Sequence, residues 1–199
     1  MKQLELTEHT KPLLTENNFG KLLPKDLQKV SKTFFTPIRI AQIATQWLTE
    51  DGPKKIFDIG AGIGKFCISG AHYSDSFFYG IEYRESLVDI GNELIKHFEI
   101  KNVVLEKGDI LDVNFKLYNA FYMYNPFFEN LVAPKRLNNE VRLADNLYDT
   151  YKNYTEQQLD NAPISTRLVT YHGNNFEVPS SYEKVNQTDD GLLKLWIKF

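Results

Sequence analysis

Three glycines alternate with single residues in the segment 56–65, which reads Ile-Phe-Asp-Ile-Gly-Ala-Gly-Ile-Gly-Lys. Asp58 stands two residues before the first of them, and the glycines are Gly60, Gly62 and Gly64. Glycine permits a sharp backbone turn and leaves room for a ligand close to the main chain. An apolar strand pattern precedes the loop, and a helical pattern with free N–H groups at its start follows it. The segment predicts a ligand-binding loop whose acid favours a cationic group and would repel a phosphate.

Two more acidic residues stand where later strands are expected to end. Glu82 closes the apolar segment 77–82, about 20 residues beyond the loop, where a carboxylate can accept both hydroxyl groups of a ribose. Tyr83 follows it and is expected to cover an adenine, and Asp109 follows the segment 102–105. Because the carboxyl ends of parallel strands share one edge of a sheet, we expect Asp58, Glu82 and Asp109 to converge around one ligand.

The spacing of the glycines separates two classes of cofactor. The G-x-G-x-x-G pattern of nicotinamide enzymes needs its third glycine at position 65, which is Lys65. A Walker-type loop is absent, because Gly64 and Lys65 are followed by Phe66 and not by Ser or Thr. A nicotinamide-dependent oxidoreductase with a Rossmann-like sheet is kept as the alternative from another enzyme class.

The acid, the glycine trio and the two later acids together resemble the class I S-adenosylmethionine-dependent methyltransferases over about residues 55–130. The resemblance implies S-adenosyl-L-methionine as cofactor, with Glu82 on the ribose, Asp109 on the adenine amino group and Ile110 packed on the ring. It also implies contacts to the methionine part and to the rest of the cofactor from Asp58, Gly60, Ala61, Gly62, Gly64, Tyr83 and Asn125.

The fourth strand leads into Tyr124, Asn125, Pro126, Phe127 and Phe128. This run resembles the Asn-Pro-Pro-aromatic segment of methyltransferases that act on amino nitrogens, with Phe127 in place of the second proline. It is also similar to the Asn-to-Phe segment of the non-SET histone-lysine methyltransferases. Both resemblances imply that Asn125 orients an acceptor nitrogen, with Tyr124 and Phe127 beside it as further catalytic candidates.

A segment before the glycine loop carries a third resemblance. Phe34-Phe35-Thr36-Pro37 is similar to the Phe-x-Thr-Pro segment of adenine-specific DNA methyltransferases, which would place Phe35 over the cofactor. A helix entry capped by Thr36 explains the same residues without a ligand.

Composition narrows the acceptor and the compartment. The chain has 199 residues, a net charge of −3 and no basic block, so we favour a protein or small-molecule acceptor, with a nucleic-acid adenine amino group as the alternative. A single cysteine permits no internal disulfide, and no apolar run is long enough to span a bilayer, so we expect a cytoplasmic protein. The four histidines lack metal-ligand spacing, so no metal site is predicted.

Hydrophobic periodicity predicts the elements that position these residues. Strands are expected at 55–59, 77–82, 102–105, 120–124 and 166–171, with a hairpin of 181–185 and 192–199 around Asp189-Asp190-Gly191. Helices are expected at 63–73, 85–98 and 137–159, with another that begins at Thr36-Pro37 and stops at Asp51-Gly52-Pro53.

Alternation of strand and helix indicates an α/β fold with helices on both faces of the sheet. We expect a Rossmann-like, mostly parallel, seven-stranded sheet with a C-terminal antiparallel hairpin. Residues 36–199 would form the S-adenosylmethionine-binding methyltransferase domain. Residues 1–35 would add one or two short helices that pack on the site or cap it.

Overall fold

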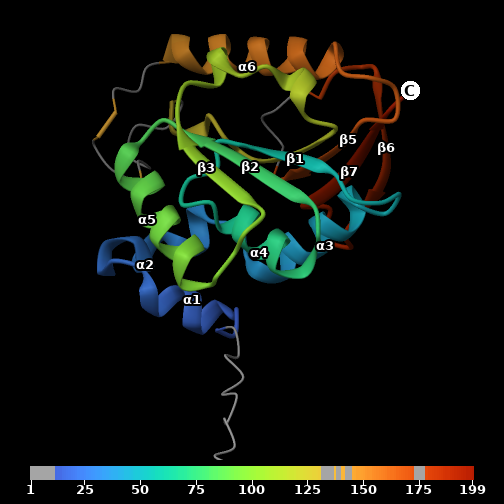
Figure 1. The fold of residues 1–199 in the computed structure, drawn as a ribbon. Helices are drawn as coiled ribbons and strands as arrows, with labels where there is room; N and C mark the ends of the chain where they lie inside the picture. The colour runs from blue at the N-terminus through green and yellow to red at the C-terminus, as the bar shows by residue number, and fades with distance from the viewer. Residues whose placement is uncertain (1–11, 131–136, 138–139, 142–144, 173–177) are drawn as a thin grey trace, which may run out of the picture.

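A computed structural model describes residues 12–130, 137, 140–141, 145–172 and 178–199 (Figure 1). Within them, seven strands form one sheet in the order β3-β2-β1-β4-β5-β7-β6. The strands are β1 (Lys55–Ile59), β2 (Phe77–Glu82), β3 (Val103–Lys107), β4 (Ala120–Tyr124), β5 (Arg167–Tyr171), β6 (Tyr182–Gln187) and β7 (Leu193–Lys198). The first five are parallel, and β7 runs antiparallel to both β5 and β6. The expected fold class is confirmed.

Helices cover both faces of the sheet (Figure 1). The helices are α1 (Glu16–Leu22), α2 (Lys25–Phe34), α3 (Ile38–Leu48), α4 (Lys65–Tyr73), α5 (Glu85–His97) and α6 (Asp145–Asp160). Single 3-10 turns form η1 (Ile110–Asp112), η2 (Phe115–Leu117) and η3 (Phe128–Asn130). Helices α3, α4 and α5 pack on one face with α1 and α2 beyond them, and α6 lies over the other face (Figure 1).

Successive side chains of β1 pack against the helices on opposite faces of the sheet. Ile56 belongs to the core shared with α3 and α4, whereas Phe57 and Ile59 belong to the core that includes Leu159 of α6. Successive side chains of a strand point to opposite faces, so Asp58 shares the face of Ile56 and lies toward α4. The site therefore has a buried acid on the α4 side of its central strand.

The start of α3 differs from the expectation. Thr36 does not cap this helix; its hydroxyl forms a hydrogen bond of 2.9 Å with the hydroxyl of Tyr122 on β4. The N-cap position is Pro37, which has no side-chain cap, and the backbone N–H of Ile38 donates to the carboxylate of Glu16 from α1. A carboxylate suits a helix N-terminus electrostatically, so a residue 22 positions away replaces the local cap.

Two element boundaries also differ. The expected helix 137–159 begins only at Asp145, and the described residues before it form bends, with the backbone N–H of Leu137 donating to Glu129 and the carboxylate of Glu140 bound to Ser86. Positions 138–139 and 142–144 lie outside the described residues. Strand β3 runs to Lys107 because that residue pairs with Glu82, which ends β2.

Candidate functional site

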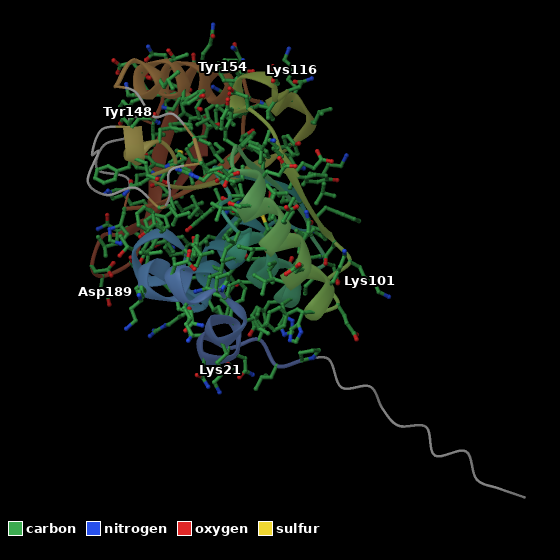
Figure 2. The ribbon with its side chains drawn as sticks, turned by 90° about the vertical axis from the view of Figure 1, so that its left-hand side faces the viewer. Lys21, Lys101, Lys116, Tyr148, Tyr154 and Asp189 are labelled. Atoms are coloured by element: carbon green, nitrogen blue, oxygen red, sulfur yellow. The ribbon has the colours of Figure 1, made fainter. Side chains whose placement is uncertain are left out.

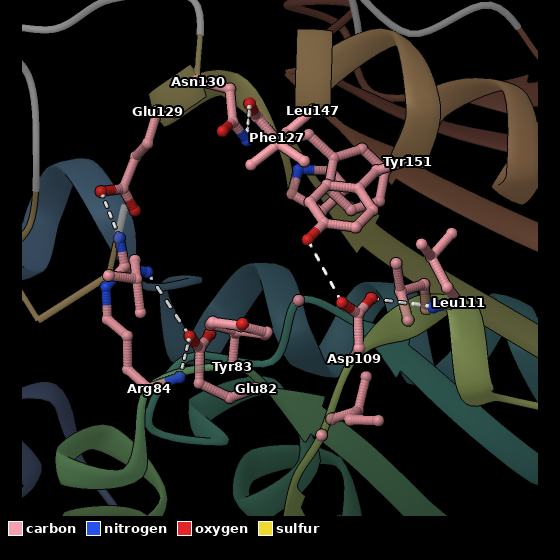
Figure 3. A pocket seen from close by; sticks show the side chains of 16 residues that line it. Glu82, Tyr83, Arg84, Asp109, Leu111, Phe127, Glu129, Asn130, Leu147 and Tyr151 are labelled. Atoms are coloured by element: carbon pink, nitrogen blue, oxygen red, sulfur yellow. Dashed lines mark hydrogen bonds and ion pairs between the residues drawn. The ribbon is translucent and has the colours of Figure 1, made fainter. Parts of the chain in front are cut away.

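Two adjoining cavities lie at the carboxyl ends of the parallel strands. The larger has a volume of about 620 Å³ and is bordered by the ends of β2 and β3, by η1 and by α6 (Figure 3). The smaller has a volume of about 380 Å³ and is bordered by the end of α2, the end of β4 and the start of α5. Both cavities are lined by Gly60, Glu82, Arg84, Pro126 and Glu129. Their sizes are those of small-molecule sites, and they share a wall.

Gly60 of the glycine loop belongs to that shared wall, where the lack of a side chain lets other residues come close to its backbone. Gly60 has a φ of +74°, and a Cβ atom at this position would lie 2.8 Å from the Cβ of Pro126. Gly62 has a φ of +57°, and its Cβ would lie 3.4 Å from the ring of Phe35. Only glycine combines a left-handed backbone with this close approach of neighbours. Helix α4 then begins at Lys65, two residues later than predicted, because Gly64 is its N-cap.

Asp58 lies beneath this loop with little to neutralise it. The residue is 4% exposed, and the thiol of Cys67 donates a hydrogen bond of 3.6 Å to its Oδ2. Burial raises the pKa of Asp58 to about 8, and the nearby charge of Glu82 adds to the rise. A buried acid that forms no ion pair within the described residues suits a cationic ligand.

Arg84 forms ion pairs with Glu82 and Glu129, and all three residues line both cavities. The Arg84 guanidinium lies 3.4 Å from Oε1 of Glu82 through Nη1 and 2.8 Å from Oε2 of Glu129 through Nη2 (Figure 3). Backbone N–H groups of Arg84 and Gly62 also donate to the Glu82 carboxylate. Burial raises the pKa of Glu82, and these hydrogen bonds and the Arg84 charge oppose the rise.

On the far wall of the larger cavity, Asp109 is held by two donors. Its Oδ1 accepts from the backbone N–H of Leu111, and its Oδ2 accepts from the hydroxyl of Tyr151 on α6 at 3.3 Å (Figure 3). Burial, followed by the Asp109 charge, raises the pKa of Tyr151 to about 12, so the phenol keeps its proton. Ile110 is buried next to Asp109, and Tyr83 stands half-exposed at the same cavity.

The end of β4 forms the boundary of the smaller cavity. Asn125 has a φ of +41°, which is unusual for a residue with a side chain and typical of functional sites. No hydrogen bond joins its side-chain amide to another described residue. Tyr124 donates to the carbonyl of Thr33 at 2.8 Å, and its ring stacks on His172 with 5.5 Å between centroids. Burial raises the pKa of Tyr124 to about 12.

The structure brings most of the residues predicted from sequence to these two cavities. The lining residues among them are Gly60, Gly62, Glu82, Tyr83, Asp109, Ile110, Tyr124, Asn125 and Phe127. Asp58, Ala61 and Gly64 line neither cavity, and the carboxylates of Glu82 and Asp109 border the same cavity. Phe35 lines the smaller cavity and packs against Gly62.

Sequence reasoning missed three polar groups at the site. Arg84 and Glu129 belong to no motif, and Tyr151 is marked only by its place within the expected helix 137–159. The position of Arg84, two residues after the acid that ends β2, was the available signal. Its significance depends on burial and on Glu129, which is 45 positions away in the chain.

A family model described as a methyltransferase domain matches residues 50–146, the stretch that holds the glycine loop, Glu82, Asp109 and Asn125. This part of the chain is a methyltransferase domain, and its fold is that of the class I methyltransferases. The protein is therefore an enzyme, and its cofactor is S-adenosylmethionine. No curated protein matches the sequence.

Solved structures share the fold of this methyltransferase. An RNA methyltransferase from Salinibacter ruber in complex with S-adenosyl-L-homocysteine is 15% identical, with 81% of this chain and 90% of that one covered and a TM-score of 0.55. Magnesium protoporphyrin IX methyltransferase from Synechocystis PCC 6803 with bound SAM is 11% identical, with 92% and 90% covered and a TM-score of 0.58. Precorrin-6y C5,15-methyltransferase from Geobacter metallireducens GS-15 is 11% identical, with 84% and 91% covered and a TM-score of 0.52.

At these identities the likeness shows the fold alone. The three proteins are named for different acceptors, so the fold does not select one. Within the described part of the methyltransferase, no helix has both the length and the apolarity needed to cross a bilayer. No group of three His, Cys, Asp or Glu side chains there is arranged to hold a metal ion.

Proposed function

We propose that this methyltransferase transfers a methyl group to a nitrogen atom of a protein or a small molecule. The larger cavity would hold the adenosine part of S-adenosylmethionine, and the smaller cavity would receive the acceptor. The observation that carries the proposal is the shared wall of Gly60 and Pro126. Because the two cavities adjoin there, ligands in them would meet beside Gly60, which has no side chain to separate them.

The residues present fit the cofactor. Asp58 is a buried acid without a cation in the described chain, which suits the ammonium group and the positive charge of the methionine part. The Glu82 carboxylate has capacity to accept from ribose hydroxyls, since each of its oxygens has two lone pairs. Asp109 stands across the same cavity, where it would accept from the adenine amino group while Ile110 packs on the ring.

When bound, the cofactor supplies a methyl group on a sulfonium whose sulfur leaves as a neutral thioether. The protein then needs mainly to align the acceptor and exclude water, which can contribute about 7–11 kcal/mol to the lowering of a barrier. Asn125 would accept a hydrogen bond from the acceptor nitrogen through its side-chain oxygen. Tyr124, with its pKa raised to about 12, would contribute a neutral aromatic wall and no base.

The acceptor class is inferred from the size and charge of the smaller cavity. A volume of about 380 Å³ suits one side chain or one small molecule. The lining carries Lys32 and Arg84 against Glu82 and Glu129, so it offers no excess of positive charge for a phosphate backbone. The aromatic rings of Phe34, Phe35 and Tyr124 favour a nitrogen carried on an apolar or planar group.

Asn125→Gly tests the role of the amide without disturbing the backbone, because glycine accepts a φ of +41°. We expect turnover to fall by about 100-fold, with the melting temperature and the affinity for S-adenosylhomocysteine nearly unchanged. Full activity in this variant would remove Asn125 from the mechanism.

The acceptor class is tested by transfer of a tritiated methyl group into a lysate of the source cells, with Asn125→Gly as the matched inactive control. Label in protein or in small molecules, absent with the variant, supports the proposal. Label that disappears only after nuclease treatment would contradict it and would assign a nucleic-acid acceptor.

A further inference from the structure

Arg84 lies in the wall between the two cavities and is 7% exposed. It follows β2 by two residues and forms the N-cap of α5, so the backbone at both ends of it is fixed by regular structure. A buried guanidinium is costly unless it is paired and hydrogen-bonded. Its carboxylate partners Glu82 and Glu129 each line both cavities. Figure 3 shows their contacts with Arg84.

The contacts continue beyond the two carboxylates. Glu82 Oε2 accepts from the backbone N–H of Gly62 in the glycine loop at 3.1 Å. Glu129 Oε2 accepts from the backbone N–H of Leu137 at 2.9 Å, in addition to the bond from Arg84. A continuous series of hydrogen bonds therefore runs from the glycine loop, through Arg84, to Leu137, which borders the acceptor cavity.

A second arginine, whose side chain is 11% exposed, shows that pairing alone does not explain this arrangement. Arg167 also contacts two acids, Glu50 and Asp51, but these are 70% and 47% exposed. It stands at the start of β5, at the opposite edge of the sheet. The partners of Arg84 are only 8% and 18% exposed and face ligand cavities.

We infer that Arg84 is a positioning residue that couples the nucleoside side of the site to the acceptor side. Its planar fork holds Glu82 and Glu129 at the same time, which a lysine ammonium on a flexible stem does less well. Loss of the Glu129 carboxylate, which binds Leu137 at the acceptor cavity, then loosens Glu82, which binds the glycine loop, and it does so through Arg84. This inference rests on the proposed function, since it takes Glu82 to contact the ribose.

A double-mutant cycle tests the coupling, with calorimetric titration of S-adenosylhomocysteine into the full chain as readout. We expect Glu129→Gln to weaken binding about threefold and Arg84→Met about tenfold or more. The double variant should bind no more weakly than Arg84→Met alone, and Arg84→Lys should fall between wild type and Arg84→Met. Multiplying effects of the two substitutions, or no effect of Glu129→Gln, would overturn the inference.

Arg167→Met is the matched control, because it removes a similarly buried arginine from two acids at the other edge. It should lower the melting temperature and leave the affinity for S-adenosylhomocysteine within about twofold. If Arg84→Met does not fold, Glu129→Gln and Arg84→Lys still decide the question through the same titration. If wild type itself binds no S-adenosylhomocysteine, the proposed function fails, and the inference fails with it; additive effects on a protein that binds overturn the inference alone.

Discussion

Charged and polar groups at the two edges of the sheet are partnered differently. At the amino edge, Arg167 contacts the carboxylates of Glu50 and Asp51 and the carbonyl of Trp47. At the carboxyl edge, Asp58 is buried without an ion pair in the described chain, and no described residue binds the amide of Asn125. A buried acid normally has a cation beside it, so an edge that leaves Asp58 without one is suited to a cationic ligand.

Two glycines at the carboxyl edge differ in their surroundings. One is Gly191, in the hairpin turn beside the end of β5, and Figure 2 shows the neighbouring residue Asp189 at the surface of the molecule. Gly191 in that hairpin has a φ of +67°, but a Cβ there would meet nothing within 4 Å. Gly60 has a similar φ and would meet Pro126 at 2.8 Å. Gly191 is required only for the backbone conformation of the turn, whereas Gly60 is required both for its backbone conformation and for the close packing of Pro126.

Asp58→Asn is the change with the largest expected effect. It removes the carboxyl group that we propose to ionise opposite the ammonium group of the bound cofactor, while it keeps the shape of the side chain. We expect the affinity for S-adenosylmethionine to fall by about 100-fold, measured by calorimetry. Affinity equal to that of wild type would show that Asp58 plays no part in cofactor binding.

Asp58→Asn is also expected to change how the free energy of unfolding depends on pH. The folded chain keeps the Asp58 proton up to a pKa of about 8, whereas the ordinary value is 3.8. Between these values the folded state holds a proton that the unfolded chain has released, so the free energy of unfolding of wild type falls as the pH rises. Glu82, whose pKa is also raised, adds a slope of the same sign.

Asp58→Asn should therefore show a flatter dependence of stability on pH between about pH 4 and 8. At about pH 9 it should be more stable than wild type by about 1–3 kcal/mol. Thermal unfolding across this range provides the measurement. Parallel curves for the two proteins would contradict the raised pKa of Asp58.

Two glycine substitutions distinguish the energetic cost of a left-handed backbone from the cost of a steric clash with a neighbouring residue. Gly191→Ala imposes only a left-handed backbone on alanine and should cost about 1 kcal/mol. Gly60→Ala adds the contact with Pro126 and should cost about 2–4 kcal/mol and weaken cofactor binding. Denaturant unfolding of both variants gives the comparison, and equal losses would mean that Pro126 yields without cost.

Arg167→Met gives the smallest expected effect on function. Loss of its contacts should lower the free energy of unfolding by about 1 kcal/mol. Turnover and cofactor affinity should stay within about twofold of wild type. A large loss of affinity in this variant would break the separation between the two edges.

The sequence predicted the fold and much of the site where local chemistry decides the outcome. Gly60 and Gly62 were predictable because a loop with positive φ favours glycine, and Glu82 because it ends a strand at a fixed distance from that loop. Thr36 was misjudged as a helix cap, since its partner Tyr122 is 86 positions away. The helix expected from Leu137 starts at Asp145, because Leu137 is bound to Glu129 instead.

Arg84 and Tyr151 could not be predicted as site residues for the same physical reason. Each acquires its role from a partner brought near by the fold, Glu129 for Arg84 and Asp109 for Tyr151. Periodicity places a residue on a face of an element, but it does not say which charge on another element lies opposite. Long-range pairs of buried polar groups are therefore the part of the site that sequence patterns leave out.

Titration of S-adenosylmethionine and, separately, of NADH into the full chain tests the central claim most directly. We expect one equivalent of S-adenosylmethionine to bind per chain, with a dissociation constant in the micromolar range, and NADH to give no heat of binding. Binding of NADH without binding of S-adenosylmethionine would contradict the assignment of the two cavities to methyl transfer.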